Sequence, residues 1–147
     1  MSVLGAIVFV LLAAIALLHL AWGFGLCWPA ANERELVAFV VGANGRARMP
    51  GATACAVAAA CVFSAGIVAL LLGGWLEVRG QETLVNFAGL AVFVVFAVRG
   101  AFAYRPEWRA RFSQQPFARY DRIYFGPLCL CIACVFAFLL LERMRTG

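Results

Sequence analysis

Four long apolar segments dominate the sequence and restrict what the chain can fold into. They cover residues 3–26, 53–76, 84–104 and 123–141. Each has roughly the 20 residues that a helix needs to cross a hydrocarbon layer of about 30 Å. Because backbone polar groups in lipid must be satisfied within the segment, each one is expected to be helical. The sequence therefore predicts an all-α integral membrane protein built as a four-transmembrane-helix bundle.

The composition agrees with this class and leaves room for one domain. Of the 147 residues, 65% are hydrophobic and 13% are charged, whereas a soluble domain is about half apolar. The connecting segments are too short to form a second core, so we expect a single transmembrane domain over residues 1–147. The N-terminus lacks the basic region of a secretory signal, which favours a retained first span.

Two connections are long enough to have structure of their own. Residues 36–41 are apolar but too short to span, and they precede Asn44 and Gly45. A Val-rich run followed by Asn-Gly favours a short β-hairpin between the first two spans, with an interfacial segment as the alternative. In the other connection, Pro106 is expected to open a short helix at the level of the lipid head groups.

The arginines, which are the only basic residues apart from one His, predict the orientation. Eight lie in or next to the two long connections and three lie on the opposite side. The eight are Arg34, Arg46, Arg48, Arg105, Arg109, Arg111, Arg119 and Arg122. The positive-inside rule then places the long connections in the cytoplasm and both termini outside it. Anionic head groups of membrane lipids are the expected partner of this face, and no separate basic domain indicates nucleic-acid binding.

Three polar residues are expected to lie at one depth of the bundle. His19 is seven residues before the end of the first span, and Arg99 is five before the end of the third. Each therefore lies about 8–10 Å inside the same boundary, and Asp121 opens the fourth span there. Ionisable residues inside a span are costly and commonly mark functional sites. We therefore expect an imidazole, a guanidinium and a carboxylate in one layer on the cytoplasmic side.

Each of these residues also has a structural interpretation. The side chain of Arg99 can extend to the head groups, and His19 can bond to a neighbouring backbone group. Asp121 can cap the N-terminus of the fourth span, where a carboxylate is favourable. An ion pair between Arg99 and Asp121 would join the third and fourth spans.

The cysteines give no strong indication of a metal. Cys129, Cys131 and Cys134 have a spacing that resembles a ligand set, but on a helix Cys129 points away from Cys131. No second cluster accompanies them, so we expect neither a metal nor another cofactor, and their role stays open.

Several motifs resemble a family of small bacterial membrane proteins known as domain of unknown function 3995. They are His19-Leu20-Ala21-Trp22-Gly23, Trp28-Pro29, Arg99-Gly100, Phe117 to Tyr124 with the sequence FARYDRIY, and Pro127-Leu128-Cys129. The resemblance covers nearly the whole chain. It implies a four-helix membrane fold in the bacterial inner membrane, and it draws attention to His19, Arg99, Asp121 and Tyr124 without naming a reaction.

The leading functional hypothesis is a pocket near the cytoplasmic leaflet that binds, or acts on, a lipid-like or small amphipathic molecule. Trp22, Trp28, Phe102 and Tyr124 would line this pocket, and Arg99 would meet an anionic or carbonyl group.

Two further classes of function, and the question of catalysis, stay open. If the protein is an enzyme, His19 or Asp121 would move protons, and isomerisation or cyclisation of an apolar substrate would fit. A structural or accessory membrane subunit is the alternative. A small transporter, acting as a homo-oligomer, is less favoured because every acidic residue lies at or beyond the end of a span.

Overall fold

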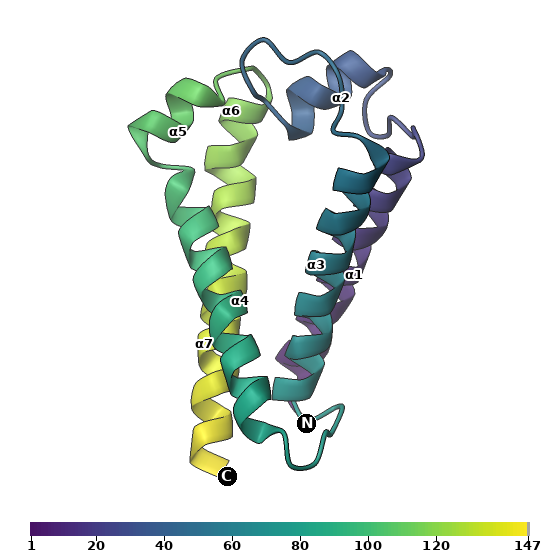
Figure 1. The fold of residues 1–147 in the computed structure, drawn as a ribbon. Coiled ribbons are helices and arrows are strands. Elements are labelled where there is room, and N and C mark those ends of the chain that lie inside the picture. Colours follow the sequence, from purple (N-terminus) through teal and green to yellow (C-terminus); the bar gives the residue numbers. More distant parts are fainter. Residues whose placement is uncertain (147) are drawn as a thin grey trace.

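The chain forms four long helices and several short ones (Figure 1). The computed structural model describes residues 1–146, and no strand occurs among them. The long helices are α1 (Val3–Gly23), α3 (Ala52–Leu72), α4 (Glu82–Phe102) and α7 (Gly126–Thr146). The short ones are α2 (Glu33–Val40), α5 (Pro106–Arg111), α6 (Phe117–Tyr120) and a π-helical turn, η1 (Asp121–Phe125), which joins α6 to α7. The predicted helix after Pro106 is confirmed as α5.

Four helices are long and apolar enough to cross a membrane. The prediction of an all-α, four-helix membrane fold is therefore confirmed. The fourth runs without a break from Phe117 to Arg145 through α6, η1 and α7, so it begins earlier than the apolar run at residue 123. Pro127 consequently lies inside this helix and cannot donate a hydrogen bond to the carbonyl of Ile123. The π-helical turn occupies the place where that bond is lost.

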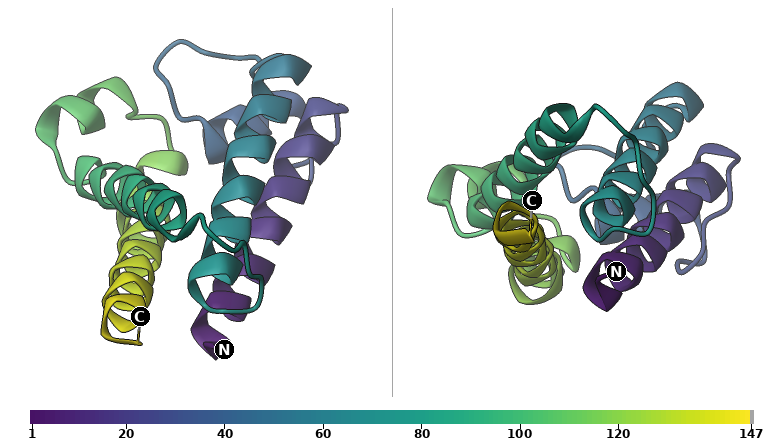
Figure 2. Two further views of the ribbon diagram at one scale, coloured as in Figure 1. Left: turned by 60° about the horizontal axis from the view of Figure 1, so that its bottom comes forward. Right: turned by 90° about the horizontal axis from the view of Figure 1, so that it is seen from below.

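The long helices form two pairs, α1 with α3 and α4 with α7. Seen along the bundle axis, the pairs lie beside each other (Figure 2). Glycines allow the close approach within each pair. A Cβ at Gly5 of α1 would lie 2.7 Å from the carbonyl oxygen of Ala69, and one at Gly100 of α4 would lie 2.7 Å from Cγ of Leu130. Small residues commonly have this role where membrane helices pack.

The core joins the two pairs near the chain termini, at what we call the termini end. Its buried residues are Val8, Leu12, Ala65, Ala69, Leu72, Val85, Ile132, Phe136 and Leu139. Toward the opposite end, the roof end, the pairs diverge (Figure 1). The two long connections, residues 24–51 and 103–120, lie across that end, and we call them the roof.

The first part of the roof contains a helix, α2, so the preference for a β-hairpin was wrong. Asn32 caps this helix, because its side-chain oxygen accepts a hydrogen bond from the backbone N–H of Glu35 at 3.0 Å. The carboxylate of Glu35 accepts one in return from the backbone N–H of Ala31 at 3.2 Å. Leu36 and Val37 on the first turns are buried. A reciprocal cap and a buried apolar face together outweigh the β-preference of valine.

The Asn-Gly sequence forms a loop that connects the two halves of the roof. The side chain of Asn44 donates to the carbonyl of Ala110 at 2.8 Å and accepts from the hydroxyl of Ser113 at 2.6 Å. Gly42 has a φ of +64°. A Cβ on it would lie 2.1 Å from Cδ1 of Phe117. Only glycine fits this position, since it combines a left-handed conformation with close packing.

Candidate functional site

Two adjoining cavities lie beneath the roof, between the helix pairs. The larger, of about 560 Å³, is bordered mainly by α1, α2 and the start of the fourth helix, in α6 and η1. The smaller, of about 340 Å³, is bordered mainly by α1, α3 and the segment around α5. They share five residues, which are His19, Trp22, Val40, Arg99 and Phe117. We call the two cavities together the cleft.

The wall of the larger cavity is almost entirely apolar or aromatic. Its aromatic side chains are Trp22, Trp28, Phe39, Phe117, Tyr120, Tyr124 and Phe125. Tyr120 connects this wall to the roof, with its ring centre 5.2 Å from that of Phe39 and 5.6 Å from that of Tyr124. Among the described residues that border this cavity, only His19 and Arg99 have an ionisable group other than a tyrosine hydroxyl.

Arg99 and Asp121 form an ion pair next to the cleft. Nη2 of Arg99 lies 2.5 Å from Oδ1 of Asp121, and Nε1 of Trp108 donates to Oδ2 at 2.9 Å. The guanidinium also lies over the ring of Trp108, 4.9 Å from its centre. Of the alternatives that the sequence left open for Arg99 and Asp121, the ion pair is therefore the one present. It links α4, α5 and the start of the fourth helix.

Asp121 does not cap a helix. It has helical backbone angles, and its backbone N–H bonds to the carbonyl of Phe117 one turn earlier. The capping interpretation was wrong because the helix begins at Phe117, not after Asp121. The carboxylate is instead 2% exposed, and each of its oxygens has a partner.

Arg99 has hydrogen-bonding capacity that the protein does not use. In the part of the chain that the structure describes, its Nη1 is buried and has no hydrogen-bond partner. The side chain as a whole is 32% exposed and borders both cavities of the cleft. A ligand oxygen that reaches the guanidinium from the cleft would satisfy this nitrogen.

His19 faces the same cleft from α1. Its Nδ1 lies 2.8 Å from the carbonyl oxygen of Ile15, and only the protonated nitrogen can donate to a carbonyl. In the neutral imidazole, Nε2 is then an acceptor, and no described residue is bonded to it. The structure thus brings Arg99 and Asp121 into contact, whereas His19 shares the cleft with Arg99 without a hydrogen bond to either. The catalytic roles of His19 and Asp121 stay predictions.

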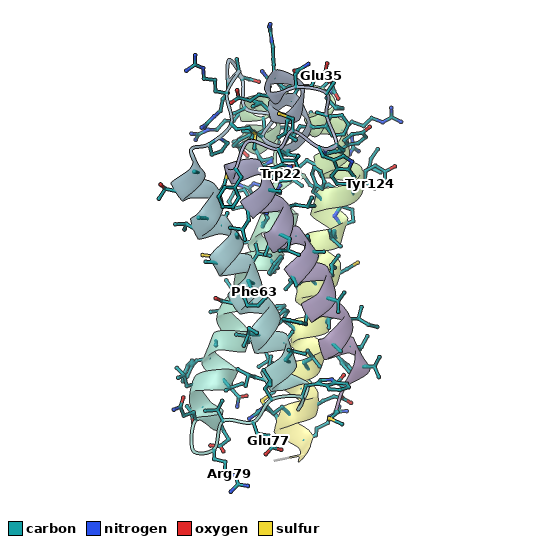
Figure 3. All side chains as sticks on the ribbon, turned by 90° about the vertical axis from the view of Figure 1, so that its right-hand side faces the viewer. Trp22, Glu35, Phe63, Glu77, Arg79 and Tyr124 are labelled. Atoms are coloured by element: carbon teal, nitrogen blue, oxygen red, sulfur yellow. The ribbon has the colours of Figure 1, made fainter. Side chains whose placement is uncertain are left out.

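The other predicted ligand-binding residues lie on the larger cavity. Trp22 donates its indole N–H to the carbonyl of Trp28 at 2.8 Å, which fixes one ring against the start of the roof. Trp22 and Tyr124 lie at one level under the roof, with Glu35 above them (Figure 3). Phe102 does not border the cleft; its ring contacts Trp108 instead, with 5.9 Å between their centres.

Sequence reasoning missed Trp108 and Phe117 as parts of the site. Trp108 lies in an Arg-rich connection, and only the fold of α5 brings it to Asp121. Phe117 is 4% exposed at the start of the fourth helix, where it packs against Gly42. The available signal was the presence of four aromatic residues, Trp108, Phe112, Phe117 and Tyr120, among the arginines of residues 105–122.

No metal centre accompanies the cleft. Among residues 1–146, no group of three or more His, Cys, Asp or Glu side chains is placed to hold a metal ion. All six cysteines are free thiols, and Cys131 and Cys134 face outward.

Comparison with known proteins places the chain in a family. A family model described as protein of unknown function (DUF3995) matches residues 12–136. The chain belongs to the DUF3995 family. The resemblance noted in the sequence is thereby confirmed, and the match includes His19, Arg99 and Asp121. No curated protein and no solved structure matches this DUF3995 chain.

Proposed function

We propose that this DUF3995 protein binds one lipid-like amphiphile in the cleft, with the polar group of the ligand at Arg99. The observation that supports this most is Arg99 itself, which borders an open cavity with an apolar and aromatic wall and whose buried Nη1 has no partner among the described residues. A buried donor without a partner costs about 1–3 kcal/mol. An acceptor oxygen on a ligand would remove that cost.

The cleft has the size and position that such a ligand requires. Its larger cavity, about 560 Å³, is within the roughly 300–1,000 Å³ typical of small-molecule sites. It is bordered by the partly buried Leu18 of α1 and Leu128 of α7, and also by Tyr124, which is 61% exposed. Because these helices are long enough to cross a membrane, a hydrocarbon chain can reach the cavity sideways from the bilayer.

The roof is proposed to lie against the cytoplasmic leaflet of a bacterial inner membrane. It has eight arginines and only three acidic residues outside the buried pair, whereas the termini end has three of each. Anionic head groups attract such a surface by about 1 kcal/mol per basic residue. The cleft would then open at the level where the acyl chains of that leaflet begin.

The test is to fill the cleft without changing the ion pair. Leu18→Trp puts a large ring into the larger cavity, and Leu17→Trp adds the same ring at a neighbouring position that is 66% exposed. Each protein is purified in mild detergent, and co-purified small molecules are identified by mass spectrometry. We expect an amphiphile with wild type and Leu17→Trp, reduced at least tenfold with Leu18→Trp. Equal amounts in all three proteins, or none in wild type, would contradict the proposal.

The buried position of Asp121 favours a second candidate, a structural or accessory subunit whose polar residues only hold the helices together. His19→Phe separates the two, since it removes the imidazole from the cleft and leaves the contact between Arg99 and Asp121 in place. A folded protein that has lost its amphiphile supports a binding site. A variant that cannot be purified in folded form supports the structural role.

A further inference from the structure

We infer, on the basis of the binding function proposed above, that the polar group of the ligand is a neutral ring with a carbonyl or hydroxyl oxygen. Phospholipids and fatty acids, which present a phosphate or carboxylate, are the classes that this inference excludes as the preferred ligand.

The charge of the cleft favours a neutral polar group on the ligand. Arg99 is the only permanently charged residue among the described residues that border the two cavities, and the carboxylate of Asp121 already neutralises it. An anionic head group at Arg99 would meet that carboxylate at short range in a medium of low dielectric constant, where like charges repel strongly. A neutral oxygen accepts a hydrogen bond from Nη1 without this repulsion.

Arg99 and His19 together present a hydrogen-bond donor and an acceptor to a ligand. Arg99 offers Nη1 as a donor, and His19 offers Nε2 as an acceptor because its Nδ1 donates to Ile15. Both residues border both cavities. A ring carbonyl can accept from the guanidinium, and a ring hydroxyl can donate to the imidazole. A phosphate dianion or an oxidised quinone offers acceptors only, so among these groups only one with a ring hydroxyl gives Nε2 a partner.

The aromatic lining of the larger cavity favours a flat ring. Flat aromatic side chains make up half of the lining of the larger cavity, and the ring centre of Trp22 lies 5.2 Å from that of His19. Aromatic pairs gain about 0.5–1.5 kcal/mol beyond the burial of their area, which favours a flat ring over a tetrahedral head group. Ile15, Leu18 and Leu128 continue the wall with aliphatic side chains, and they suit a hydrocarbon tail attached to that ring.

The experiment compares three probes on the purified full-length protein in detergent. They are a benzoquinone with a ten-carbon tail, dodecyl phosphate and dodecanol, and their binding is measured by native mass spectrometry and by the shift in Tm. We expect one quinone per protein, with a Kd at least tenfold lower than that of either other probe. Leu18→Trp should abolish this binding, and Leu17→Trp should leave it unchanged.

Two variants of His19 test the acceptor. His19→Phe keeps a flat ring but removes Nε2, so the reduced, hydroxyl-bearing form of the quinone probe should bind at least fivefold more weakly. His19→Gln keeps an acceptor oxygen and should restore most of the affinity. Circular dichroism and Tm of the unliganded variants confirm that each is folded.

The outcomes separate the class of ligand from the existence of a site. Tightest binding of dodecyl phosphate, abolished by Leu18→Trp, would overturn the neutral-ring inference and leave the proposed function intact. Binding of all three probes that is equal and insensitive to Leu18→Trp would overturn both. Preferential binding of the quinone that depends on Leu18, together with binding of its reduced form that depends on His19, supports both.

Discussion

The guanidinium of Arg99 is held by two residues from different elements. Asp121 contributes a carboxylate from η1, and Trp108 of α5 contributes both a ring face and a hydrogen bond to that carboxylate. Buried ion pairs are weak stabilisers as a whole, but removing one partner leaves an uncompensated charge. Asp121 therefore holds the side chain of Arg99 in place beside the cleft.

Asp121→Asn should destabilise the protein by about 3 kcal/mol, near the low end for breaking a buried pair, because 32% of the Arg99 side chain is exposed. The free energy of unfolding is measured by denaturant titration in mixed micelles. Glu107→Gln is the control. Glu107 lies 3.6 Å from Arg105, and both side chains are exposed, so the loss should be below about 1 kcal/mol. Equal losses for the two variants would contradict the structural role given to Asp121.

The two halves of the roof meet at a tight contact in the loop after α2. Gly42 packs against Phe117, and Asn44 bonds to Ala110 of α5 and to Ser113 just after it. Gly45 lies in the same loop with a similar φ, +74°, but a Cβ added to it would meet nothing within 4 Å. The two glycines therefore differ in packing and not in backbone conformation.

Gly42→Ala should cost about 2–4 kcal/mol, since overpacking adds to the strain of a left-handed alanine. Gly45→Ala should cost only the strain, about 1 kcal/mol. Limited proteolysis of the roof reports the difference, with cleavage between residues 42 and 51 faster in Gly42→Ala. Identical cleavage rates for the two variants would show that the contact with Phe117 does not hold the roof.

The long helices were predictable, whereas the short ones were harder. Twenty apolar residues allow one structure in a bilayer, so α1, α3, α4 and the fourth helix followed from the sequence. The segment at 33–40 was misread because valine and Asn-Gly favour a hairpin, and the signal of the cap, Asn32 followed by Glu35, lies outside the apolar run. His19 and Arg99 were found because ionisable residues stand out in apolar helices. Trp108 was not, because its contact depends on how α5 folds back.

The roof end and the termini end of the molecule differ in net charge. The roof has a large excess of arginine over acidic residues, and the termini end is balanced. Because the same end also contains the cleft, the orientation in the membrane determines which leaflet supplies the ligand. The arrangement predicts that the ligand comes from the cytoplasmic leaflet.

Reporter fusions in a bacterial host test this orientation. Alkaline phosphatase fused after Gly147 should be active, and a fluorescent protein at the same position should be dark, since the first folds outside the cytoplasm and the second inside it. The matched control inserts each reporter at Gly45 in the roof, where the two results should be reversed. The opposite pattern at both positions would place the roof, and with it the cleft, at the outer leaflet.

The two helix pairs contact each other near the termini end and diverge toward the roof. A small tilt of one pair would therefore move its roof end much further than its core end. Over the roughly 30 Å length of a 20-residue helix, a tilt of about 5° displaces the far end by roughly 3 Å. The buried side chains near the pivot, such as Phe136 and Leu139, hardly move in such a tilt. The contact of Gly42 and Asn44 with the other half of the roof would then set the width of the ligand that fits the proposed site. Substitutions in the loop around Gly42 and in the segment after α5 would therefore change the size of the ligand that the proposed site accepts, without repacking the core.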